Sequence, residues 1–207
     1  YPTLSRLHRQ APENYARLAR LGLRYSLLAL LPLAAIGAAV ADGLLHLIYG
    51  PDYLVSATVL QVSIWSIPLF LLEIYAITLL MVEHKLRAAL WITAVHLVLT
   101  VLLLPPLTVM MGAVGAALAV LVAGAAGAGF GILLLWRGRL PLRLDQWWLI
   151  LGASGIAGIV TVMLPAPWVL QAAAGVGVYL AIIWLTGVLS PRDFRALRQI
   201  IAGGGAQ

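Results

Sequence analysis

The stretch MGAVGAALAVLVAGAAGAGFG, residues 111–131, decides how this chain folds. Five of its six glycines suggest a packing pattern: Gly112, Gly115, Gly124, Gly127 and Gly131. The last three recur at steps of three and four, so they form a groove along one face of a helix. In lipid, such a groove lets another helix approach closely and gain dispersion contacts. The stretch therefore predicts a helix-packing surface, entered through a tight turn at its first glycines.

The same stretch lacks the features of a nucleotide-binding loop. GAAGAGFG, residues 124–131, does not contain G-x-G-x-x-G, and no acidic residue follows about 20 positions later inside a βαβ unit. The motifs of zinc proteases, serine hydrolases and P-loop proteins are absent as well, and the histidines are too scattered to suggest a metal site. The chain has no cysteine, which excludes thiolate chemistry. The sequence predicts no enzyme activity, no cofactor and no metal.

Composition predicts an all-α integral membrane protein. Of the 207 residues, 63% are hydrophobic and 10% are charged, whereas a soluble domain has about 25% charged residues. Because about 20 apolar residues in a helix cross a bilayer, the apolar stretches predict six spans. Their expected bounds are 25–49, 58–82, 88–104, 112–136, 147–164 and 168–189.

All 13 lysines and arginines fall on one side of these six spans. They precede the first span, lie between the second and third and between the fourth and fifth, or follow the sixth. The opposite loops, around Pro51, Pro105 and Pro165, contain none. Because cytoplasmic loops are enriched in basic residues, we expect this side to face the cytoplasm. The net charge of +6 then indicates contact with anionic membrane lipids rather than with nucleic acid.

Two expected spans carry acidic residues, which are costly in a membrane and therefore functional candidates. In the first span, Asp42, His46 and Tyr49 share one face. They form either a pair near the interface that water reaches or a proton-coupled lining of a cavity. In the second span, Glu73 lies deep among apolar residues. It is either a site of substrate passage or proton coupling, or a structural hydrogen bond between helices.

A third polar stripe lies in the third span. Thr93, His96 and Thr100 follow one another at i, i+3 and i+7, so they share a helix face. A single polar stripe on an apolar helix normally faces the interior of a bundle. We expect the stripe to face inward and leave open whether it contacts a substrate.

Four features of the chain resemble the C-terminal half of polysaccharide exporters and O-antigen flippases. These belong to a superfamily with multidrug extrusion proteins and lipid II flippases. The resemblance lies in YPTLSRL at 1–7, in LLALLPLAAIGAAVADGLLHLIYGPDY at 27–53, in HLVLTVLLLPPLTVMMGAVGAALA at 96–119, and in two further helices after the basic loop. One departure is that His96 and Thr100 stand where the family usually has asparagines.

The resemblance implies a transporter of the bacterial cytoplasmic membrane that works by alternating access. It would flip a polyprenyl-pyrophosphate-linked oligosaccharide, a precursor of lipopolysaccharide O-antigen, to the outer leaflet. Phosphate contacts would come from Arg24, from protonated His96 or from an N-terminal lobe of the same chain. We expect that lobe to precede Tyr1, where the sequence begins without a methionine.

The resemblance also implies an organisation in five parts with both ends on the cytoplasmic side. They are a helix end and amphipathic entry helix at 1–24, four spans of the C-terminal lobe at 25–136, a basic loop at 137–146, two additional spans at 147–189 and an amphipathic tail at 190–207. Two other functions stay open. One is a multidrug or small-molecule cation antiporter of the same superfamily; the other is a non-transporting membrane subunit or an enzyme acting on polyprenyl-phosphate lipids.

Overall fold

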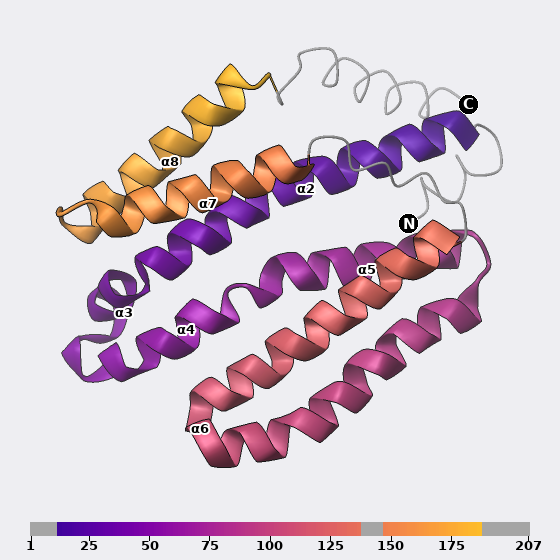
Figure 1. The fold of residues 1–207 in the computed structure, drawn as a ribbon, viewed down its shortest axis with the longest axis horizontal. Coiled ribbons are helices and arrows are strands. Elements are labelled where there is room, and N and C mark those ends of the chain that lie inside the picture. The colour runs from indigo at the N-terminus through magenta and orange to yellow at the C-terminus, as the bar shows by residue number, and fades with distance from the viewer. Residues whose placement is uncertain (1–11, 138–146, 188–207) are drawn as a thin grey trace.

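A computed structural model describes residues 12–137 and 147–187, and within these ranges every regular element is helical. The elements are α2 (Pro12–Ala39), α3 (Ala41–Tyr49), the 3-10 helix η1 (Pro51–Ser56), α4 (Ala57–Ser63), α5 (Ser66–Val82), α6 (Leu86–Arg137), α7 (Trp147–Met163) and α8 (Trp168–Leu185) (Figure 1). The predicted all-α fold is confirmed. Most of the expected basic loop at 137–146 and all of the expected tail at 190–207 lie outside the described residues.

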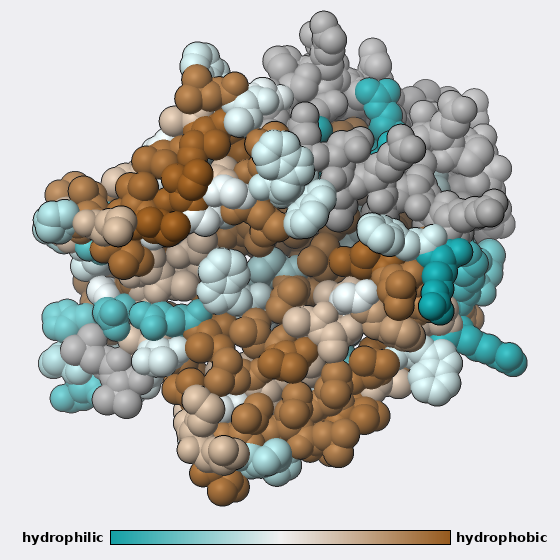
Figure 2. All heavy atoms as spheres, viewed as in Figure 1, coloured by the Kyte–Doolittle hydropathy of each residue, from teal (hydrophilic) through white to brown (hydrophobic). Residues whose placement is uncertain are grey.

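Four helical stretches are long and apolar enough to cross a membrane: Arg17–Ala39, Ala57–Val82, Leu86–Arg137 and Trp168–Leu185. The helix α7 is apolar but shorter. Figure 2 shows a face on which apolar residues predominate, with hydrophilic side chains mainly toward the two ends. The molecule therefore has the helices that a membrane-embedded protein requires.

The first expected span differs from the observed helices at both of its ends. The helix α2 begins at Pro12 and continues without a break through the expected entry helix, where Tyr15 and Ala19 are buried. It ends at Ala39, because Val40 leaves the helical conformation before α3 begins. The described part of the expected entry helix therefore forms the first turns of a longer, packed helix.

The second expected span is interrupted between α4 and α5, and Pro68 explains the position of the break. A proline has no N–H to donate to the carbonyl four residues earlier, and its ring crowds that carbonyl. For Pro68 this carbonyl belongs to Ile64, which lies in the interruption. The Ser66 hydroxyl donates to the Ser63 carbonyl at 2.5 Å and so satisfies one of the freed groups.

The helix α6 consists of two arms that fold back on each other (Figure 1). The first arm covers residues 86–111 and the second 113–137, with Gly112 between them at φ 61° and ψ −138°. A Cβ atom at Gly115 would lie 1.9 Å from the carbonyl oxygen of Leu107, so the tight turn needs glycine there. The sequence placed the break at Pro105; the helix instead includes both prolines, and its non-helical residue is Gly112.

The helices pack as two groups. In the α5–α6 region, α5 lies along α6, and in the α2–α7–α8 region α7 packs against both α2 and α8. Contacts between α2 and α5 join the regions, and two tyrosines reinforce the position of α2. The Tyr75 hydroxyl on α5 donates to the Ala19 carbonyl, and the Tyr179 hydroxyl on α8 donates to the Leu28 carbonyl at 2.6 Å.

Candidate functional site

A buried ionisable pair joins α5 to the first arm of α6. Nδ1 of His96 lies 2.7 Å from Oε2 of Glu73, which is within hydrogen-bond and ion-pair distance. The Glu73 side chain is 7% exposed and the His96 side chain 17%. Ionisable groups are rare in apolar helix bundles because their burial is costly, and where they occur they usually mark a functional site. Two of the residues that the sequence singled out separately therefore form one site.

The second arm of α6 covers the pair with its glycine face. A Cβ atom at Gly127 would lie 3.0 Å from the carboxyl carbon of Glu73 and 3.1 Å from each of its oxygens. On the same arm, a Cβ atom at Gly124 would lie 3.9 Å from Cε1 of His96. The carboxyl group thus rests on bare backbone at Gly127, where a larger side chain would displace it.

Phe70 and Thr100 complete the surroundings of the imidazole. The ring of Phe70, one turn before Glu73, stacks on the ring of His96 with centroids 5.4 Å apart and an angle of 15°. The Thr100 hydroxyl donates to the His96 carbonyl at 2.9 Å, so it is satisfied within its own helix. The imidazole is therefore held between an aromatic ring, a carboxyl group and the glycine face of the second arm.

The contact between Glu73 and His96 can hold a proton in two arrangements. A protonated imidazole donates its Nδ1–H to the carboxylate, and a protonated carboxyl group donates its O–H to Nδ1. With one dissociable proton, either arrangement is neutral overall; without it, the pair carries one negative charge. A net charge in an apolar interior costs several kcal/mol. The protonation of the pair and the packing around it are therefore coupled.

The connection between α5 and α6 explains why these two residues meet. Glu73 lies eleven residues before His84, and His96 lies eleven residues after Lys85. In antiparallel helices joined by a short turn, residues equally far from the turn lie at the same depth. At about 1.5 Å per residue this depth is about 16 Å, near the middle of a hydrocarbon core about 30 Å thick. This equal spacing is a feature of the sequence from which the pairing could have been found.

Other predicted site residues lie away from the pair. Thr93 is exposed, so the expected inward-facing stripe is wrong at this position. Asp42, His46 and Tyr49 are all exposed on α3, and within the described part of the chain the expected Asp42–His46 pair does not form. Thr93 is exposed because the interior face of the first arm runs through Ile92 and His96 instead. Of these, Ile92 is fully buried.

Charged residues at the end of α5 form a separate cluster. Lys85 Nζ lies 2.8 Å from Glu83 Oε2, next to His84, which has a left-handed φ of 58°. Burial and the nearby Glu83 carboxylate raise the pKa of Tyr15 to about 12, so this phenol stays protonated at physiological pH. The cluster closes the turn between α5 and α6.

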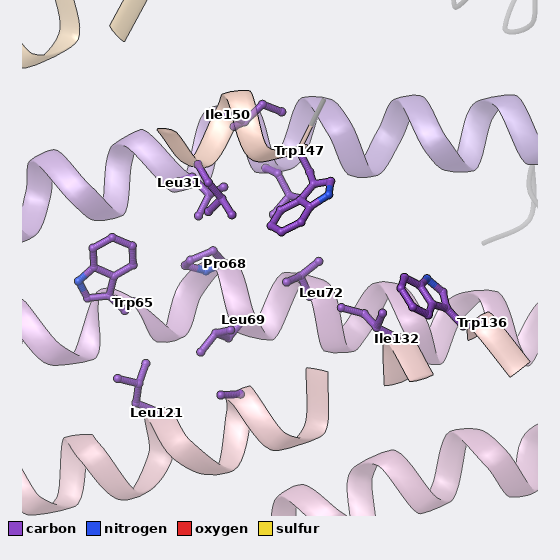
Figure 3. A pocket seen from close by; sticks show the side chains of 13 residues that line it. Leu31, Trp65, Pro68, Leu69, Leu72, Leu121, Ile132, Trp136, Trp147 and Ile150 are labelled. Carbon is purple, nitrogen blue, oxygen red and sulfur yellow. The ribbon is translucent and has the colours of Figure 1, made fainter. Parts of the chain in front are cut away.

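An apolar cavity of about 1110 Å³ lies beside the pair, between α2, α5, α6 and α7 (Figure 3). Among the described residues that line it, none is ionisable. Trp65 stands at one end of the labelled group and Trp136 at the other (Figure 3). Leu69 connects the cavity to the site, because its Cβ lies 3.9 Å from the position that a Cβ atom at Gly124 would occupy. Half-buried Arg24 precedes the cavity residue Leu27 by one turn of α2.

Sequence reasoning missed both Phe70 and the cavity. An aromatic residue in an apolar span carries no signal of its own until its neighbour on another helix is known. Comparisons of the chain with protein-family models, curated proteins and solved structures found no match. The site is therefore defined by its own residues and geometry.

Proposed function

We propose that this protein is a membrane transporter that moves a lipid-linked oligosaccharide from the cytoplasmic to the outer leaflet of a bacterial cytoplasmic membrane. The two arms of α6, counted as separate crossings, are compatible with six spans. The restriction of all basic residues to one side of such spans supports a cytoplasmic location for both ends of the chain. The motif resemblance to polysaccharide exporters supports the substrate class.

The observation that carries this choice of substrate is the apolar cavity. A lipid-linked sugar has a long hydrocarbon tail that must stay in apolar surroundings while its polar head crosses. The cavity is slightly larger than the range of about 300–1,000 Å³ typical of ligand pockets, and apolar side chains line it. Arg24, three residues before the cavity residue Leu27, would supply the cation for a phosphate group near the membrane surface. Further phosphate and sugar contacts would come from the expected N-terminal lobe.

Leaflet transfer in vesicles tests this proposal. The longest natural chain containing this sequence is reconstituted with a fluorescent polyprenyl-pyrophosphate oligosaccharide, and its transfer between leaflets is measured. Ala125→Trp would fill the cavity wall, and Ala113→Trp, on the exposed start of the second arm, is the matched control. Displacing two methylene groups of the tail costs about 1.6 kcal/mol, so we expect about a tenfold weaker apparent affinity for Ala125→Trp and little change for the control.

The absence of wild-type transfer with any polyprenyl-linked sugar would contradict the proposal. Chemical conversion of the lipid without transfer would instead favour a membrane enzyme. Equal transfer by the two tryptophan variants would remove the cavity from the mechanism.

A small-molecule cation antiporter is the second candidate, favoured by the buried carboxyl group of Glu73. Such a group could attract a lipophilic cation when it is ionised. The same vesicles, loaded with a fluorescent lipophilic cation, distinguish the two functions. Cation transport that Glu73→Gln abolishes, without sugar transfer by the wild type, would select the antiporter.

A further inference from the structure

We propose that Glu73 and His96 together form a proton-binding site, and that the second arm of α6 packs at Gly127 when this site holds one dissociable proton. The two groups are 2.7 Å apart and deeply buried. The backbone of Gly127 lies directly against the carboxyl group. A bound proton therefore sits at the point where three helical segments meet.

The surroundings favour a site that is neutral overall. On α5, Tyr75 is the nearest other ionisable residue in sequence, and its hydroxyl is bonded to Ala19. The described side chains of α4 include no ionisable group, and those of α6 besides His96 are at its two ends, Arg87 and Arg137. On α2 the ionisable groups whose side chains the structure describes are Tyr15, Arg17, Arg20, Arg24 and Tyr25. Within the described residues, the polar side-chain partner of each member of the pair is the other member.

The ligand set selects a proton rather than a metal ion. Sodium and calcium ions bind several oxygen atoms, and this site offers one carboxyl group and an imidazole nitrogen. Zinc and other transition metals need further ligands, and among the described residues no third histidine, cysteine, aspartate or glutamate joins the pair. Oxygen and nitrogen atoms at this distance share a proton readily.

The direction of the pH effect follows from the charge. Loss of the proton on raising the pH leaves one negative charge beneath Gly127, so the closed packing weakens and an opened, hydrated site is favoured. Gain of a second proton on lowering the pH leaves one positive charge and also weakens the packing. At alkaline pH, closing the site requires the uptake of one proton. The equilibrium constant for closure therefore falls by at most about tenfold for each unit by which the pH rises.

Spin labels measure this opening without a substrate. The chain has no cysteine, so Ile67→Cys on α5 and Val122→Cys on the second arm of α6, both at exposed positions, give two unique sites. The distance distribution is recorded in lipid nanodiscs between about pH 5 and 9, the range in which histidines titrate. We expect the short-distance population to decrease toward alkaline pH in the wild-type background and to be pH-independent there in Glu73→Gln.

The matched control is Glu83→Gln, which removes a carboxyl group at the end of α5, ten residues after Glu73, and should retain the wild-type profile. If Glu73→Gln does not fold, His96→Gln serves instead: its Glu73 carboxyl group still loses a proton, so the alkaline change should persist, but its midpoint should shift because the imidazole partner is gone. A flat wild-type profile, the wild-type alkaline change in Glu73→Gln, or an unshifted midpoint in His96→Gln would overturn the proposal. A shift caused by replacing sodium with choline at constant pH would overturn the choice of the proton.

Use of this proton to drive a substrate rests on the proposed function. The two failures are distinguishable: a flat spin-label profile would leave leaflet transfer standing, and absent transfer would leave the proton site standing.

Discussion

The α5–α6 region and the α2–α7–α8 region pack by the same means but treat polar groups differently. Both bring helices together over glycine. A Cβ atom at Gly131 would lie 2.7 Å from Cβ of Ala76, and one at Gly175 would lie 2.1 Å from the Thr161 hydroxyl. In each region the absence of a side chain on one helix admits a neighbour.

Apart from the tyrosines that bond to α2, the two regions differ in where their buried polar side chains find partners. In the α2–α7–α8 region, the hydroxyls of Ser154 and Thr161 donate to carbonyls one turn earlier in α7, at 2.7 and 2.8 Å. In the α5–α6 region, Glu73 and His96 are satisfied across the helix interface. A hydroxyl bonded within its own helix tolerates movement of its neighbours, whereas a pair shared between helices depends on their spacing. The hydroxyls therefore constrain their neighbours little, whereas the pair depends on how α5 and α6 pack.

The largest effect should follow from removing one member of the pair. His96→Leu leaves the Glu73 carboxyl group without its partner, and breaking a buried ion pair in this way costs about 3–5 kcal/mol of unfolding free energy. Thr161→Val, its counterpart in the other region, removes a hydrogen bond within one helix and should cost about 1 kcal/mol. Reversible unfolding in mixed micelles measures both. Equal losses would erase the distinction between the two regions.

Added methyl groups on the glycine faces should have the next largest effect. Gly131→Ala meets the rigid Cβ of Ala76, and overpacking of this kind costs about 1–3 kcal/mol. Gly129→Ala, which has no neighbour within 4 Å, is the control and should be neutral or slightly stabilising. Thermal unfolding in detergent compares them; a neutral Gly131→Ala would show that the arm is not tightly packed.

The corresponding substitution in the other region can be rescued. Gly175→Ala meets the Thr161 hydroxyl, so a second substitution, Thr161→Ala, should recover part of the lost stability. Thr161→Ala should not restore stability to Gly131→Ala. These two substitutions lie in different regions, so their effects on the unfolding free energy should simply add.

The tyrosine hydroxyls that hold α2 should contribute similarly to both regions. Tyr75→Phe removes the hydrogen bond to Ala19, and Tyr179→Phe removes the one to Leu28. Each change should cost about 1 kcal/mol, the net value of a typical intramolecular hydrogen bond. Denaturation curves of the two variants would diverge if one region depended on α2 much more than the other.

The smallest effect concerns how helices end in the two regions. At the end of α5 the left-handed conformation falls on His84, whereas at the end of α8 it falls on Gly187, which adopts it easily. His84→Gly should stabilise the chain by about 0.5 kcal/mol, because relief of left-handed strain exceeds the added backbone entropy of glycine. A lower melting temperature for His84→Gly would show that the His84 imidazole stabilises the chain by more than its left-handed strain costs.

Much of the helical pattern was predictable because it follows from local chemistry. Apolar length predicts spans at 147–164 and 168–189, where the structure has α7 (Trp147–Met163) and α8 (Trp168–Leu185), and Gly112 predicts a turn. The interruption at Ile64 needed the pairing of a proline with the carbonyl four residues earlier, which a hydropathy pattern does not reveal. The end of α2 at Val40 has no signal in the sequence that we can identify.

The sequence singles out the individual site residues better than it predicts which of them contact each other. Glu73 and His96 stand out as ionisable residues in apolar helices, yet their partnership depends on how each helix is rotated. In an apolar helix nearly every face is compatible with lipid, so the sequence constrains this rotation weakly. The same reason explains why Thr93 lies outside despite sharing a predicted stripe with His96. Tertiary packing on Gly127 fixed what local patterns left open.

A double-mutant cycle on the pair addresses the interdependence of Glu73 and His96. The unfolding free energies of the wild type, Glu73→Leu, His96→Leu and the double variant are measured in the same micelles at one pH. We expect each single change to be more harmful than the double change, with a coupling energy of at least about 1 kcal/mol, because replacing the whole pair leaves no buried charge. Additive losses, agreeing within about 0.5 kcal/mol, would contradict a functional pair at this interface.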